Sequence, residues 1–171
     1  MVSMGPNSYS RLYSHMSDFH DIRSNTRTTK VNENSILDIL NKTEEFSKFR
    51  ELLKHSQYES KMNDCNMQIT LIVPINEAFP DDFFSELDNY QASMYVLSNM
   101  VLGDRVIPSE LLELSPISKI STKFNTPNYM IVKNINGTTY INNCKVIIKD
   151  ILAKNGIIHV VDKLNLPQYY I

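Results

Sequence analysis

The side chain with the clearest potential for chemistry is His159, which lies in an otherwise apolar run. A histidine that acts as a catalytic base needs a nucleophile beside it and a carboxylate that orients its ring. No Ser or Cys lies in a nucleophile-elbow pattern, and the other histidines are His15, His20 and His55. We therefore interpret His159 as a buried histidine that binds backbone groups, and Asp162 as a turn residue. The sequence predicts a protein that is not an enzyme.

The two cysteines, Cys65 and Cys144, are too far apart in sequence for a zinc pattern, which needs paired ligands two to four residues apart. They form either one disulfide in an oxidising compartment or two separate thiols, and we favour the thiols. The sequence also has no Gly-rich phosphate loop and no pair of histidines spaced as metal ligands on a helix. We expect no metal and no cofactor.

Composition restricts the class of protein. The chain has 171 residues, of which 42% are hydrophobic and 21% charged, with a net charge of -2. These values suit one domain, or one domain with a tail, with enough apolar residues for a core of its own. No long run of basic residues suggests a nucleic-acid partner, and no apolar stretch is long enough to span a membrane.

Residues 1–30 differ from the rest of the chain in the pattern of their apolar and polar residues. Polar and charged residues interrupt every short apolar stretch, so this segment contains no apolar region of the kind that a secretory signal needs. We expect a polar, disordered extension that is dispensable for folding.

Helices are expected before the first strand. Asn34 or Ser35 can cap a helix over residues 36–40, and Thr43 offers a second N-cap. The second helix would turn its apolar residues towards the core: Phe46, Phe49, Leu52 and Leu53.

A buried strand is expected over residues 68–73, because this run is rich in β-branched residues and ends at Pro74. Asn76 can cap a short helix after it. The apolar spacing of residues 91–102 predicts a further helix, with Gly103 as its C-cap.

From residue 117 onward the sequence reads as short strands. Turn signals separate them at residues 125–127 and at Asn136-Gly137, a dipeptide typical of tight hairpins. The last apolar run follows Asn155-Gly156. Helices followed by a mostly antiparallel meander indicate an α+β fold.

Two segments resemble the characteristic boxes of fasciclin-like (FAS1, or beta-Ig-H3) domains. The first is residues 70–79, Thr-Leu-Ile-Val-Pro-Ile-Asn-Glu-Ala-Phe, and the second is residues 155–162, Asn-Gly-Ile-Ile-His-Val-Val-Asp, followed by Leu164, Leu166 and Pro167. Their order and separation agree with the family. The resemblance places the domain at residues 31–168 and leaves a short tail at 169–171.

The resemblance implies a wedge in which several helices pack against an antiparallel-rich sheet. It also implies extracellular or cell-surface adhesion, with a receptor such as an integrin, a matrix protein or a glycan as partner, and no catalytic site. The alternative is an intracellular scaffold or host-interaction protein that uses the fold without matrix binding. Within the boxes we expect structural roles for Pro74, Asn76, Asn155, Gly156, His159 and Asp162.

Two sites are candidates for binding. Asp150-Ile151 resembles an Asp-Ile integrin-recognition segment, and a carboxylate there could dock on a receptor's metal ion, because hard cations prefer oxygen ligands. Alternatively, Asp150 caps a turn and Ile151 fills the core. Asn99-Met100 stands where many adhesive members have a Tyr-His pair, so we expect these residues to contribute less to binding than that pair would.

Overall fold

The computed structural model describes residues 30–102, 106–122 and 129–165. Several features expected from the sequence lie outside these residues: the extension through residue 29, the Gly103 cap, the turn at residues 125–127, Pro167 and the tail.

The described residues form one seven-stranded sheet with the order β2-β1-β7-β6-β5-β4-β3. The strands are β1 (Ile69–Pro74), β2 (Met100–Leu102), β3 (Ile117–Ser121), β4 (Tyr129–Ile135), β5 (Thr138–Ile141), β6 (Cys144–Ala153) and β7 (Gly156–Val161). Within this part of the chain every pair of neighbours is antiparallel except β1 and β7, which run parallel. The sheet is therefore mixed and rich in antiparallel pairs, and the fold is α+β, as expected.

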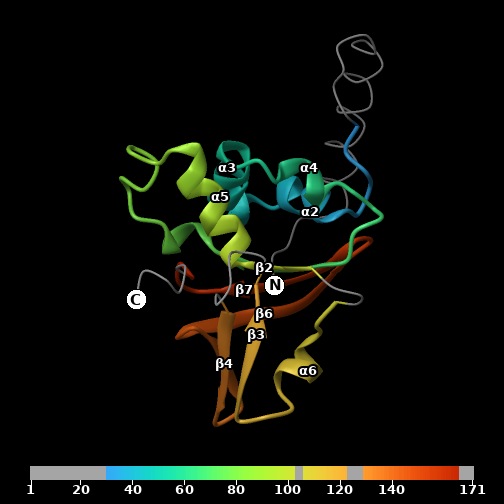
Figure 1. The fold of residues 1–171 in the computed structure, drawn as a ribbon, viewed down its shortest axis with the longest axis vertical. Coiled ribbons are helices and arrows are strands. Elements are labelled where there is room, and N and C mark those ends of the chain that lie inside the picture. The colour runs from blue at the N-terminus through green and yellow to red at the C-terminus, as the bar shows by residue number, and fades with distance from the viewer. Residues whose placement is uncertain (1–29, 103–105, 123–128, 166–171) are drawn as a thin grey trace.

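The helices fall into two groups. They are α2 (Ile36–Lys42), η2 (Glu44–Phe46), α3 (Ser47–His55), α4 (Glu59–Met62), η3 (Asn76–Ala78), α5 (Asn89–Ser98) and α6 (Ser109–Leu112). In Figure 1, α2 to α5 gather on one side of the β2-β1-β7 end of the sheet, whereas α6 lies beside β3 and β4. The described helices α2 to α5 thus cover one end of the sheet, and at the other end α6 is the one helix among the described residues.

The main core lies between β1, β7 and the first helix group. The register places Leu71 opposite Ile158 and Val73 opposite Val160, and all four side chains are fully buried. The two box segments therefore form adjacent strands of one core. Both strands are buried on both faces, which explains why they read as continuous apolar runs rather than as alternating ones.

The helix caps agree only in part with the prediction. The hydroxyl of Ser35 accepts the backbone N–H of Asp38 at 3.1 Å and caps α2 as expected. Thr43 does not cap with its side chain, because its hydroxyl donates instead to the carbonyl of Ile39 at 2.7 Å.

The helix predicted over residues 91–102 extends beyond the observed end of α5 (Asn89–Ser98). The observed helix ends at Ser98, and Met100–Leu102 forms β2, which pairs with β1 through Leu71 and Met100. Strand pairing at the edge of β1 satisfies backbone groups and buries Met100 completely, and this outweighs the helical spacing of the apolar residues.

Two tight turns connect β4, β5 and β6. Asn136 and Gly137 have φ values of 50° and 82°, and Asn142 and Asn143 have φ values of 49° and 69°. Paired positive φ values suit the two-residue turns that join twisted antiparallel strands. The first turn is the hairpin predicted from Asn136-Gly137.

Candidate functional site

A bulge in β6 brings the main candidate residues together. Between Ile148 and Ile151 the strand advances three residues while its partner β7 advances two, from Val160 to Ile158. Asp150 lies in this bulge with φ 62°, a conformation that non-glycine residues seldom adopt. Bulges re-aim side chains, and this one turns the Asp150 backbone N–H towards β7.

His159 on β7 forms a hydrogen bond with that backbone group. Its Nδ1 accepts the N–H of Asp150 at 3.2 Å, and its Nε2 lies 2.8 Å from the carbonyl oxygen of Ile107. The imidazole must therefore carry its proton on Nε2 and be neutral. Burial lowers the pKa of His159 below its ordinary value, against the opposing effects of the Ile107 hydrogen bond and the charge of Asp150. The ring links the bulge to the segment before α6.

The carboxylate of Asp150 binds the start of α6. One oxygen accepts the backbone N–H of Ser109 at 2.8 Å, and the other accepts the Ser109 hydroxyl. Pro108, at the N-cap position, makes no side-chain cap, so Asp150 supplies the cap from another element. Partial burial alone would raise the pKa of Asp150. The two hydrogen bonds from Ser109 and the electrostatic effects of His159 and Lys149 outweigh burial and lower the pKa below its ordinary value.

Ser109, Asp150 and His159 together bear a superficial likeness to a catalytic triad. The sequence does not point to Ser109, because nothing local links it to a residue 41 positions away. The order of contacts is nevertheless different from a triad: the serine hydroxyl binds the carboxylate, and both ring nitrogens of His159 face backbone groups. A general base must reach the proton that it removes. In this arrangement the cluster fixes backbone segments.

Ile151 and its neighbour Leu152 lie on opposite faces of β6. Ile151 is half-buried, pairs with Ile158 and packs against the main core. Leu152 is 74% exposed. The structure thus gives Asp150 a capping role and Ile151 a packing role, as in the alternative expected from the sequence. The Asp150 residue as a whole nevertheless stays exposed.

Asn99 and Met100 are inside the fold. They are 3% and 0% exposed, and the Asn99 amide donates to the carbonyls of Tyr95 at 2.8 Å and Asn165 at 3.1 Å. Because neither side chain reaches solvent, their burial is consistent with the expectation that the pair contributes less to binding than a Tyr-His pair would, which stays a prediction. The pair instead joins the end of α5 to β2.

Asn155 and Gly156 connect the two boxes to the helices. The Asn155 side chain accepts the N–H of Ile36 at 2.8 Å and donates to the carbonyls of Met62 at 2.9 Å and Asp64 at 3.2 Å. Gly156 lies so close to β1 that a Cβ atom would be 1.9 Å from the Ile69 carbonyl oxygen. Only glycine fits there.

Asn76 caps a helix, but a different helix from the predicted one. Its side-chain oxygen accepts the N–H of Lys48 at 2.8 Å, and its amide donates to the carbonyl of Glu44 and the hydroxyl of Ser47. It thereby caps α3 from a distance, since the N-cap residue of α3, Phe46, has no side-chain cap.

Pro74 and Asp162 lie where the two core strands end. Pro74 closes β1 opposite Val161. The Asp162 carboxylate accepts the N–H of Lys145 at 2.9 Å, and the Lys145 carbonyl accepts the N–H of Asp162 at 3.1 Å. Asp162 thus continues the pairing of β6 with β7 beyond the last strand residue.

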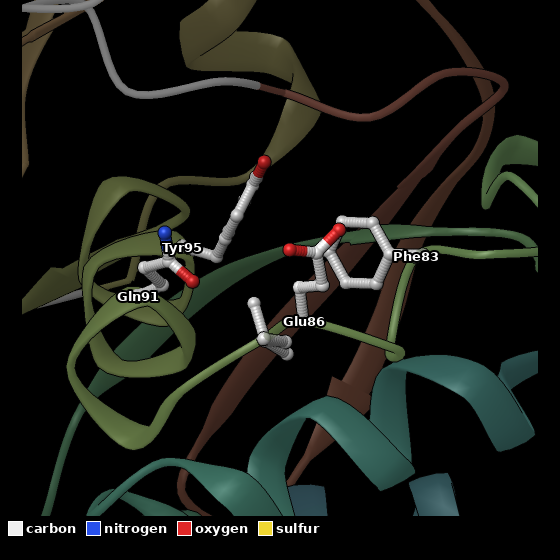
Figure 2. Close-up of a pocket in the computed structure, with 5 residues that line it drawn as sticks. Phe83, Glu86, Gln91 and Tyr95 are labelled. Atoms are coloured by element: carbon white, nitrogen blue, oxygen red, sulfur yellow. The ribbon is translucent and has the colours of Figure 1, made fainter.

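A pocket of about 210 Å³ opens between α5 and the loop before it. Figure 2 shows Gln91 and Tyr95 on one side and Phe83 and Glu86 on the other. The Phe83 and Tyr95 rings meet edge to face with centroids 5.2 Å apart, and Gln91 is fixed in a capping box with Asp88. None of these residues was predicted as a site.

The two cysteines differ in solvent exposure. Cys65 is exposed, Cys144 is buried, and both thiols are free. Burial and the nearby Asp162 carboxylate raise the pKa of Cys144 to about 11, partly opposed by Lys163. In the three described ranges no group of His, Cys, Asp and Glu residues could hold a metal ion, and no helix is long and apolar enough to cross a membrane.

This mixed, wedge-like sheet with helices packed at one end defines a FAS1-type α+β domain. Residues 44–167 match the model of the fasciclin domain, so the chain belongs to the fasciclin-domain family.

Two known proteins show the range of the likeness. Human periostin is 29% identical over 140 residues, which are 81% of this chain and 16% of periostin. The solved FAS1 domain pair of fasciclin I, an insect cell adhesion molecule, matches with a TM-score of 0.66 and 19% identity over 82% of this chain and 53% of that one. The second likeness shows the fold alone. The chain therefore spans about half, or much less, of the proteins that it matches.

Proposed function

We propose that this chain is a non-enzymatic protein-binding module of the adhesion type that engages a protein receptor or a matrix component outside the cell. Membership of the fasciclin-domain family and the likeness to an insect cell adhesion molecule support this proposal. The observation that carries it is the arrangement of Ser109, Asp150 and His159. Each of the three side chains forms hydrogen bonds to backbone groups or to a neighbouring side chain. The cluster is therefore better suited to shaping a binding surface than to catalysis.

The contact with a receptor is proposed at Asp150 and Ile151. The Asp150 carboxylate has lone pairs beyond the two that Ser109 uses, and the residue stays exposed, so a receptor's metal ion can still approach an oxygen. Ile151 anchors the bulge from below, and the exposed Leu152 next to it offers an apolar contact.

Cell attachment to the immobilised full chain tests the proposal. Asp150→Asn keeps an oxygen for the cap of α6 but removes the charge, and should reduce attachment, whereas Asp81→Asn at another exposed carboxylate should not. Equal attachment to wild type and Asp150→Asn would exclude the Asp150 contact. A wild-type protein that supports no attachment would contradict adhesion itself.

Location is tested separately. A tagged full-length protein should be recovered from the medium or the cell surface. Recovery only from the cytosol would instead favour the scaffold function.

A further inference from the structure

Charge is unevenly distributed along the sequence. Residues 115–149 contain five lysines and no Asp or Glu, although the chain as a whole has a net charge of -2. This stretch includes β3, β4, β5 and the first part of β6. All of the Asp and Glu residues therefore lie elsewhere, and the charged side chains of β3, β4 and the first part of β6 are all lysines.

One face of these strands packs inward and the other is open. On β4 and β5, Met130, Val132 and Ile141 are buried in a second apolar cluster with Leu112 of α6. The alternate residues point the other way, since successive side chains of a strand lie on opposite faces. They form what we call the basic–apolar face: Ile117, Lys119, Lys133, Ile135, Tyr140 and Lys145.

The strand register orders this face. Ile117 pairs with Lys133, Lys133 with Tyr140, and Tyr140 with Lys145, so apolar and basic residues alternate in one row across four strands. Neighbouring strands are about 4.8 Å apart, which separates the two lysines of the row by about 10 Å. Ile117 and Ile135 are 60% and 52% exposed, which is high for isoleucine.

The lysines of this face are available. In the part of the chain that the structure describes, none of the three forms an ion pair. Lys119 lies 4.6 Å from the centre of the Tyr129 ring. The carboxylates close to β6 are already engaged, because Asp150 binds Ser109 and Asp162 binds the Lys145 backbone.

We propose that the basic–apolar face is a docking surface for an acidic protein segment in which carboxylates alternate with apolar side chains. This proposal rests on the proposed protein-binding function and names a surface and a partner chemistry for it. Carboxylates would pair with the three lysines while apolar side chains cover the isoleucines and Tyr140. A purely polyanionic ligand would satisfy the lysines but leave the isoleucines exposed, so the alternating row favours a protein segment.

The test uses the full chain and a soluble peptide in which Glu alternates with Val, with binding followed by fluorescence anisotropy at low and moderate salt. The charge-reversed variant K119E/K133E/K145E should bind at least about tenfold more weakly. The matched variant K30E/K48E/K154E, which carries the same change in net charge outside this face, should bind as the wild type does. Ile135→Ser should also weaken binding, and a peptide with Ser in place of Val should bind poorly.

Other outcomes overturn the proposal. Equal weakening by both triple variants would show only a response to net charge. Equal binding of the Val and Ser peptides, or binding of heparin or anionic vesicles that Ile135→Ser does not affect, would identify a general polyanion site. Cell attachment with the same variants separates this proposal from adhesion. If cells attach to the wild type but no variant of this face changes peptide binding, the docking proposal fails and the adhesion proposal stands. If the peptide binds as expected but cells do not attach, the adhesion proposal fails and the docking proposal stands.

Discussion

The backbone N–H of Asp150 donates to Nδ1 of His159 over 3.2 Å, and this contact exists only while the imidazole is neutral. Protonation would place a second N–H against the first and would add a charge to a fully buried ring. Asp150, Lys149 and Glu113 all act on the ring electrostatically, but burial dominates and lowers the pKa of His159. The bulge that shapes the Asp150 region therefore depends on the protonation state of His159.

The first prediction concerns pH. Unfolded His159 binds a proton near its ordinary pKa of 6.5, while the folded protein binds one only at lower pH, so the unfolded state holds more protons in between. Stability should be complete above that value and should fall as pH decreases through it, by up to about 1.4 kcal/mol per pH unit. Urea unfolding of wild type and His159→Gln between about pH 5 and pH 8 measures this. His55→Gln, at a partly exposed histidine, is the control variant and should keep the slope. A slope that survives His159→Gln would contradict the assignment.

The second prediction concerns the paired core strands. Ile158→Ala should lower the free energy of unfolding by about 2–5 kcal/mol, because Ile158 is fully buried between Leu71 and Ile151. Leu152→Ala removes a similar volume from an exposed position and should change it by less than about 0.5 kcal/mol. Chemical denaturation of both variants measures the difference. Similar values for the two would remove the basis for placing the core here.

The sequence predicted the parts of the fold that depend on local chemistry. The apolar β1 and β7 runs, the Ser35 cap and the Asn136-Gly137 hairpin follow from residue types within a few positions of one another. The end of α5 did not follow, since Met100–Leu102 is a strand only because β1 offers an edge for pairing. Local helical spacing carries no information about that edge.

The candidate site shows the same division. That His159 would be buried was predictable from its apolar neighbours, but its partners were not, because Ile107 and Asp150 come from segments 52 and 9 residues away. The sequence predicts that Asn76 caps the short helix that follows it, whereas its side chain caps α3 by binding Lys48, 28 residues away. Side chains that act across the fold are recognisable as polar and fixed, but not as partners of a particular segment.

The third prediction concerns the Asn155 amide. Asn155→Asp keeps the oxygen that accepts the Ile36 N–H but sets a carboxylate oxygen against the carbonyls of Met62 and Asp64. We expect a loss of about 2–4 kcal/mol in the free energy of unfolding near neutral pH, because a buried donor is replaced by a charged acceptor. Asn136→Asp, in an exposed turn that Asp also tolerates, is the matched control. Unfolding by heat or urea should separate them clearly, and an unaffected Asn155→Asp would show that the side chain does not connect these segments.

The fourth prediction concerns thiol reactivity. The pKa of about 11 for Cys144, against an ordinary 9.0, reduces its thiolate fraction near neutral pH by about a hundredfold, and burial restricts access further. Iodoacetamide should therefore modify exposed Cys65 first, and the native Cys65→Ser variant should react slowly until denaturant is added. Mass spectrometry over time follows both sites. Isolation of a native protein in which neither thiol reacts without reductant would point to a disulfide and contradict the free thiols.

The last prediction concerns α6, a helix of four residues whose N-terminus is capped by Asp150 from another strand. Asp150→Ala removes the acceptor for both the Ser109 N–H and its hydroxyl, whereas Asp150→Asn keeps an acceptor for the N–H. Loss of a cap costs about 1 kcal/mol, and a helix of one turn has little other stability of its own. Amide hydrogen exchange should therefore accelerate at Leu111, Leu112 and Glu113 in Asp150→Ala, less in Asp150→Asn, and not in Asp81→Ala. Since α6 also covers the inner face of β4 through Leu112, faster exchange should extend to Val132. Unchanged exchange in α6 of the Asp150→Ala variant would show that the helix is held by Leu112 packing alone, and would leave the Asp150 carboxylate available to a partner.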